Sequence, residues 1–95
     1  MTKAKISGTS RYKHAGHVSW RRVEDETVIL DLTTSVYFSL NEAGALIWEL
    51  LGEKAAVDEI HAAVCGKFDV PPALARKDLE ALVARLLDKK LLVAR

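Results

Sequence analysis

Cys65 and His61 are the residues whose types and spacing come nearest to a nucleophilic catalytic pair. They lie four positions apart in a segment with helical periodicity, so both side chains can share one helix face. A cysteine becomes a nucleophile when neighbouring cations or a base stabilise its thiolate. Only Ala62, Ala63 and Val64 separate this pair, and no cation cluster or glycine-rich turn surrounds it. The pattern therefore favours a small packed thiol beside a surface histidine, and we expect that the chain is not an enzyme.

The other residues that can carry chemistry form no recognisable cofactor or metal site. His14 and His17 are three positions apart, but a metal site takes three or four ligands, and no cysteine or carboxylate cluster completes this one. The 5 glycines stand singly instead of forming a phosphate-binding loop. Carboxylate pairs such as Glu24 and Glu26 fall at expected turns, where water solvates them. We therefore predict neither a cofactor nor a bound metal.

Length and charge exclude several classes of protein. The chain has 95 residues, 49% of them apolar, which suits one small domain with a modest core. Its 14 Lys and Arg against 13 Asp and Glu give a net charge of +1, which argues against a dedicated nucleic-acid binder. No apolar run is long enough to cross a membrane, no signal peptide is evident, and the single cysteine cannot form an internal disulfide. We expect a cytoplasmic protein without a membrane or nucleic-acid partner.

The elements that would position any site begin with strands. Residues 1–16 are polar and lack clear periodicity, which predicts a flexible N-terminal arm before a domain at 17–95. Residues 18–40 alternate with period two and are rich in β-branched and aromatic side chains. This predicts a three-stranded antiparallel meander that is apolar on one face. In its middle strand Val28, Leu30 and Leu32 share one side, and Ile29 and Asp31 share the other.

Three amphipathic helices are expected after the strands, because the apolar period changes to 3.6. Asn41 is a candidate N-cap of the first helix, and Gly52 is a candidate left-handed C-terminal cap. The second helix should run from Val57 to about Phe68, and Pro71-Pro72 should separate it from the third. Leu91-Leu92-Val93 forms a short apolar tail that should pack back on the body. The predicted apolar positions of the first helix are Ala43, Leu46, Ile47, Leu50 and Leu51, and those of the third are Leu79, Leu82, Val83, Leu86 and Leu87. Strands followed by helices make the fold class α+β.

The last strand of the meander, residues 36–40, is expected to have an open backbone edge. Natural edges are usually protected by charge or proline, and this strand has neither. Either a helix or the tail covers the edge, or a partner adds a strand to it. Tyr37 should point away from the face formed by Val36, Phe38 and Leu40. Trp48 lies off the first helix's apolar stripe and is predicted to pack at the junction of this helix with the rest of the body, at the rim of the core.

The run from Val28 to Leu51, with its core Leu40-Asn41-x-x-Gly44-x-x-Ile47-Trp48, strongly resembles the PqqD-like family. This is the family of the pyrroloquinoline quinone biosynthesis protein D and of related recognition elements for ribosomally made precursor peptides. The sequence Val57-Asp58-Glu59-Ile60 and the tail from Leu86 to Leu92 also fit its pattern. The chain looks more like the stand-alone members, including those that serve lasso-peptide maturation. Ala56 and Lys90 depart from the Thr and Gly that are common at these positions.

The resemblance implies a winged-helix-like fold and a function without catalysis. Such domains bind the leader segment of a precursor peptide as an added antiparallel strand, and present the peptide to a radical-SAM enzyme or a leader peptidase. Carried onto this chain, the docking edge is formed by Val36, Tyr37, Phe38, Ser39 and Leu40. The facing wall comes from the third helix, with Asp78, Leu82, Arg85 and Leu86 as candidates. The helix cations Arg76, Lys77, Arg85, Lys89 and Lys90 either favour acidic leaders or form a solvated face.

Two other functions remain open at this point. The expected fold outline is also that of winged-helix DNA-binding proteins, although the near-zero net charge and the strands preceding all helices argue against this. The open strand edge could instead pair with a second copy, which would make the chain a structural subunit. A leader-binding chain is expected to be a monomer or a weak homodimer.

Overall fold

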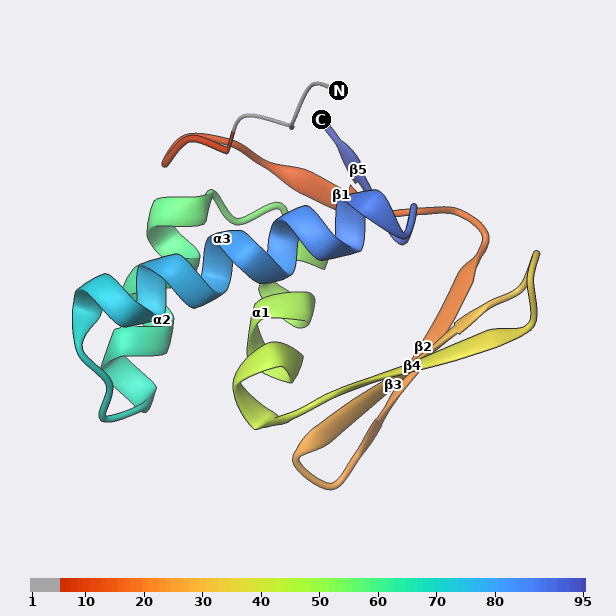
Figure 1. Ribbon diagram of the computed structural model, residues 1–95, viewed down its shortest axis with the longest axis horizontal. Coiled ribbons are helices and arrows are strands. Elements are labelled where there is room, and N and C mark those ends of the chain that lie inside the picture. Colours follow the sequence, from red (N-terminus) through yellow and green to blue (C-terminus); the bar gives the residue numbers. More distant parts are fainter. Residues whose placement is uncertain (1–5) are drawn as a thin grey trace.

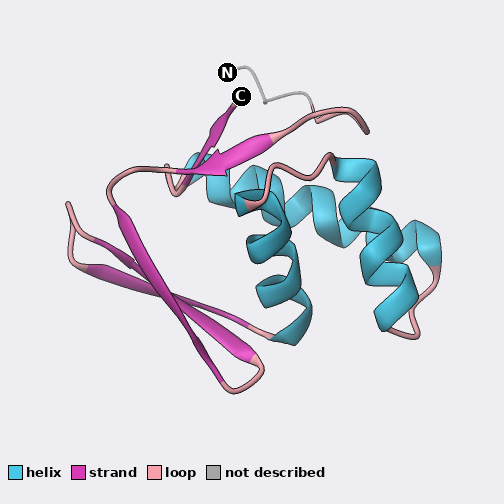
Figure 2. Ribbon diagram, turned by 180° about the vertical axis from the view of Figure 1, so that it is seen from behind, coloured by secondary structure: helices cyan, strands magenta, loops and turns pink. Residues whose placement is uncertain are grey.

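The computed structural model describes residues 6–95 as an α+β fold in which three helices lie together on one side of a twisted sheet (Figures 1 and 2). The elements, in chain order, are β1 (Tyr12–His14), β2 (Val18–Val23), β3 (Glu26–Asp31), β4 (Val36–Leu40), α1 (Glu42–Gly52), α2 (Val57–Lys67), α3 (Pro72–Asp88) and β5 (Leu92–Ala94). The predicted succession of three antiparallel strands and three helices is confirmed as β2 to β4 and α1 to α3. No helix among residues 6–95 is long and apolar enough to cross a membrane.

The sheet β2-β3-β4 carries apolar side chains on both faces, which corrects the expectation of a single apolar face. Its register pairs Trp20 with Ile29 and Ile29 with Phe38, and this row points toward the helices. Thr27, Ile29 and Asp31 are the buried residues of β3. Val28 and Leu30 therefore lie on the opposite, outer face, where both are only partly buried. The alternation was read correctly from the sequence, but it does not say which face the helices cover.

The prediction of a flexible arm over residues 1–16 is wrong for the part that the structure describes. β1 pairs antiparallel with β5, so that Tyr12 lies opposite Ala94 and His14 opposite Leu92. Tyr12 is buried in the core, with only 4% of its surface exposed. Residues 1–5 lie outside the described residues. The folded domain therefore includes residues well before His17, and the apolar tail packs back by joining this second, two-stranded sheet.

The segment before β1 also completes the first turn of α2. The carbonyl of Ser10 accepts the N–H of Val57 at 3.1 Å, and the carbonyl of Gly8 accepts the N–H of Asp58 at 2.9 Å. These N–H groups have no partner within the helix, and Ala56 has no side-chain oxygen to accept them. Backbone carbonyls from a distant segment therefore do the work that a Ser or Thr cap usually does. This explains how α2 begins cleanly at a poor capping residue.

Helix α1 begins as predicted and ends differently. The Asn41 side-chain oxygen accepts the N–H of Gly44 at 2.9 Å, which confirms the N-cap. Gly52 is the last helical residue and has no positive φ; the left-handed residue is Lys54, with φ 68°. Trp48 is fully buried in the core instead of covering its rim. The buried stripe of α1 is thus rotated toward Trp48, and Leu46 and Leu50 are only partly buried.

Helix α3 begins at Pro72, which confirms the predicted break between the last two helices. Its buried stripe is Ala75, Leu79, Val83 and Leu86, and it packs against α2 and β5. On one flank of this stripe the Arg76 guanidinium bonds to Glu80 at 2.6 Å and to Asp58 of α2 at 2.8 Å. The buried stripe fixes the rotation of α3 about its axis, and this charge cluster lies on the more exposed side of the stripe. The opposite flank, with Leu82, Arg85 and Lys89, is turned toward β4.

Candidate functional site: a groove between the open strand edge and the last helix

The free edge of β4 is the first component of the candidate site. Within the described part of the chain β4 pairs with β3 alone, so its other edge lacks a strand partner. The turn before it is tightly held: the Asp31 carboxylate accepts the N–H groups of Thr33 at 2.8 Å and Thr34 at 3.1 Å. Ser35 then adopts a left-handed φ of 61° that starts the strand. This turn sets which backbone groups of β4 face outward.

Charge also holds this turn in place. Burial raises the pKa of the Asp31 carboxyl, but the hydrogen bonds from Thr34 and Thr33 and the nearby His17 outweigh burial and lower the pKa below its ordinary value. The His17 Nε2 lies 3.7 Å from the carboxylate. Asp31 therefore stays ionised at neutral pH, and its oxygens remain acceptors for the turn.

The backbone hydrogen bonds identify the outward-facing groups of the edge. Leu32 donates its N–H to the His17 carbonyl at 2.8 Å, on the β2 side, so the neighbouring Asp31 directs its backbone groups toward β4. In agreement, the Asp31 carbonyl accepts the N–H of Ser35 at 2.8 Å. Since Ile29 lies opposite Phe38, the backbone groups of Phe38 face β3. The N–H and C=O groups of Tyr37 and Ser39 therefore point to the open edge.

A groove of about 170 Å³ runs between this edge and α3. Its floor is apolar: Leu86 and Leu91 are buried, and Phe38 and Leu82 are half-buried. Its rim is cationic, because Arg85 in α3 and Lys89, the residue that caps the end of α3, are exposed and lie four positions apart. The groove is lined by Tyr37, Phe38, Ser39, Leu40, Leu82, Arg85, Leu86, Lys89 and Leu91. Such a groove can accept an extended peptide with apolar and acidic side chains.

The structure brings together most of the residues that the sequence singled out. Val36 lies at the start of the edge strand and Asp78 on the exposed surface of α3, one turn before Leu82, and neither lines the groove. Lys89 and Leu91 also line it; Lys89 is one of the helix cations expected either to favour acidic leaders or to form a solvated face, whereas Leu91 was not predicted to line the groove. The four-residue spacing from Arg85 signals Lys89, whereas Leu91 is placed by the return of the tail toward β1.

Cys65 and His61 are close but are not arranged for nucleophilic chemistry. The Cys65 Sγ lies 3.5 Å from the His61 Nε2. The same Nε2 lies 2.8 Å from the Pro72 carbonyl, which can only accept a hydrogen bond. The Nε2 therefore carries a proton and cannot remove one from the thiol. Among residues 6–95, no three His, Cys, Asp or Glu side chains gather closely enough to hold a metal ion.

The elements that form the groove lie within the part of the chain that matches a known protein family. Residues 26–92 match the family described as "Coenzyme PQQ synthesis protein D (PqqD)". The chain belongs to the PqqD family. The matched range runs from β3 into β5, so it contains β4 with its open edge, the whole of α3, and Leu91.

Two solved structures are similar to this PqqD-family chain. One is described as "TbiB1 in Complex with the TbiA(beta) Leader Peptide"; it has 35% sequence identity and a TM-score of 0.79, over 84% of this chain and 93% of that one. The other is described as "Lasso peptide synthetase B1 complexed with the leader peptide"; it has 22% identity and a TM-score of 0.80, over 87% of this chain and 98% of that one. No curated protein sequence matches the chain. The resemblance to the PqqD-like family is thus confirmed.

Proposed function

We propose that this chain binds the leader segment of a ribosomally made precursor peptide, and holds the peptide for an enzyme that modifies or cleaves it. The observation that carries the proposal is the unpaired edge of β4 beside an apolar groove. An extended peptide can add to such an edge as a further strand, with alternate side chains directed into the groove. The leader peptides named for the two similar structures support the same reading.

The available groups are sufficient for useful affinity. Tyr37 and Ser39 each offer one N–H and one C=O, so four backbone hydrogen bonds can form, each contributing about 0.5–1.5 kcal/mol. One or two apolar leader side chains in the groove would add about 1.5–3 kcal/mol each. Ordering a disordered peptide costs several kcal/mol. At the upper ends of these ranges about 7–9 kcal/mol remains, which corresponds to a dissociation constant in the micromolar range.

The chain is proposed to act without a reaction of its own. The groove offers strand backbone, apolar side chains and two cations, and the one thiol lies on α2, outside the groove lining. Binding alone can accelerate processing. When the chain holds the peptide beside the enzyme, the effective concentration of the peptide at the enzyme is higher than that of free peptide in solution. The partner would be a radical-SAM enzyme or a leader peptidase.

A titration with a synthetic leader tests this function. Backbone amide shifts of the 15N-labelled chain are followed while the leader encoded by the neighbouring precursor gene is added. We expect the shifts to concentrate on residues 36–40 and on α3 from Leu82 to Lys89, and a scrambled leader of equal composition to produce none. Shifts confined to β2 or α2 would show that the peptide binds elsewhere and would overturn strand addition.

A further inference from the structure

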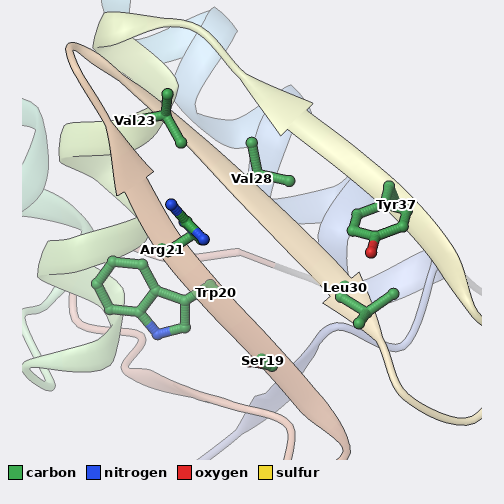
Figure 3. A pocket seen from close by; sticks show the side chains of 7 residues that line it. All are labelled: Ser19, Trp20, Arg21, Val23, Val28, Leu30 and Tyr37. Carbon is green, nitrogen blue, oxygen red and sulfur yellow. The ribbon is translucent and has the colours of Figure 1, made fainter.

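The outer face of the β2-β3-β4 sheet is hollowed and apolar. A depression of about 370 Å³ lies over all three strands, on the face opposite to the helices. Figure 3 shows Val23, Val28, Leu30 and Tyr37 rising from this face, with Arg21 among them. Val23 is 43% exposed and Tyr37 is 67% exposed. The solvent face of an antiparallel sheet is ordinarily polar, so an apolar depression of this kind marks a surface for interaction.

This outer face is continuous with the peptide groove. Tyr37 lines both the depression and the groove, because its backbone lies at the edge of the sheet while its side chain points outward. β4 runs from Val36 to Leu40, so a peptide strand antiparallel to it would leave at the Val36 end. Figure 1 shows this end as the tip of the sheet, away from α1. Leu32 and Val36 at the tip are also exposed.

We infer that the outer face docks the enzyme that processes the bound peptide, so that the enzyme meets the peptide where it leaves the sheet. This inference rests on the proposed function, because it takes the direction of the peptide from strand addition. An enzyme docked in the depression contacts Tyr37 and, at the same time, reaches the tip of the sheet. The held peptide and its enzyme then share one boundary residue without competing for the groove.

The charge on this face identifies the chemistry of the partner. Arg21 is the one charged residue among those lining the depression, and the described residues give it no ion pair. The depression itself contains no carboxylate. Glu26 shares this face with Val28 and Leu30 but does not line the depression. A second copy stacked depression to depression would therefore bring another Arg21 into apolar contact without an acid inside the contact to neutralise either one. The partner is therefore a different protein, with an apolar patch and a carboxylate that meets Arg21.

The test measures two affinities for each variant. The probes are a fluorescent synthetic leader and the purified processing enzyme encoded beside this chain, with its catalytic residue replaced so that it binds without turnover. We expect Arg21→Glu and Val23→Ser each to weaken enzyme binding about ten-fold or more, as central interface residues do. Leader binding should change less than about two-fold, because neither residue lines the groove.

Matched controls use exposed residues on α3 outside both surfaces. Lys77→Glu makes the same charge reversal, and Leu74→Ser makes the same kind of truncation at a side chain that is 49% exposed. Both should bind the enzyme and the leader as the wild type does. The inference is overturned if enzyme binding is absent or insensitive to Arg21 and Val23 while the leader still binds. It is also overturned if sedimentation shows a dimer that Arg21→Glu disrupts. If the wild-type chain does not bind the leader at all, the proposed function itself is refuted.

Discussion

The imidazole of His14 is stacked on the indole of Trp48, with ring centroids 3.7 Å apart and planes only 6° from parallel. The His14 Nε2 also donates a hydrogen bond to the Trp48 carbonyl at 2.8 Å. Trp20 meets both rings edge-on, at 5.7 Å from His14 and 6.3 Å from Trp48. The three rings belong to β1, α1 and β2. They therefore join the two-stranded sheet to the helix that follows the open edge strand β4.

The stack makes the stability of the fold depend on pH. Burial lowers the pKa of His14 from its ordinary value of 6.5, and the hydrogen bond to Trp48 offsets only part of this effect. The unfolded chain therefore binds a proton more readily than the folded chain below pH 6.5, and the free energy of unfolding falls as the solution is acidified. We expect the thermal midpoint to decrease from about pH 7.5 to about pH 5.

A His14→Phe variant isolates this contribution. Phenylalanine keeps a flat ring for the stack but has no proton to gain, so the midpoint of the variant should depend less on pH across the same range. Scanning calorimetry at several pH values compares the two proteins. Equal slopes for wild type and variant would assign the pH dependence to other groups.

Gly52 and Gly66 should respond to alanine with opposite signs. Both lie in the last turns of helices, where alanine normally stabilises by about 0.5–1 kcal/mol. A Cβ at Gly52 would lie 2.5 Å from the His14 ring, which the stack and its hydrogen bond hold in place, whereas a Cβ at Gly66 would meet nothing within 4 Å. Denaturant unfolding should show that Gly52→Ala is destabilised and that Gly66→Ala is at least as stable as the wild type. A gain in stability for Gly52→Ala would mean that the His14 ring moves aside freely.

The sequence predicted the periodic elements and missed what depends on distant contacts. Alternation of period two and 3.6 located β2 to β4 and α1 to α3, because local burial repeats along each of them. β1 has only three residues and its partner β5 lies at the other end of the chain, so no local pattern marks it. The burial of Trp48 follows from its stack with His14 in β1, and this is why the rim position predicted from the helical stripe was wrong.

Part of the candidate site could also be predicted from the sequence, because that part depends on local patterns. The edge strand and the apolar stripe of α3 are local patterns. The flank of α3 that faces the edge is set by how its buried stripe packs against α2 and β5, and no local pattern in the sequence shows this. Leu91 enters the groove lining through the return of the tail, which pairs β5 with β1 near the other end of the chain.

Arg85 is expected to select acidic leaders through a screened charge interaction. It is exposed at the rim of the groove, so Arg85→Glu should weaken binding of an acidic leader about three- to ten-fold at low salt. At high salt the loss should shrink, since screening reduces interactions between exposed charges. Fluorescence anisotropy at two salt concentrations measures both values, and Lys77→Glu provides a charge reversal outside the groove lining. A loss that does not depend on salt would assign Arg85 a packing role.

Proline substitutions in β4 provide the sharpest test of strand addition, because the register assigns opposite roles to neighbouring residues. The N–H of Tyr37 points to the open edge, so Tyr37→Pro should keep the fold and lose a donor that the peptide needs. We expect leader affinity to fall about ten-fold or more, from the lost hydrogen bond and the bulk of the ring at the edge. The N–H of Phe38 points to β3, so Phe38→Pro should damage the sheet and lower the thermal midpoint.

Tyr37→Ala is the matched control for this substitution, because it removes the same side chain and keeps the backbone donor. Circular dichroism first establishes that Tyr37→Pro is folded, and calorimetric titration with the leader then compares the three proteins. The difference between Tyr37→Pro and Tyr37→Ala measures the backbone contribution by itself. If the two variants bind the leader equally well, the peptide does not use the N–H of residue 37. Since the proline ring at the edge would also obstruct an incoming strand, equal binding would mean that the edge of β4 is not the template for an added strand.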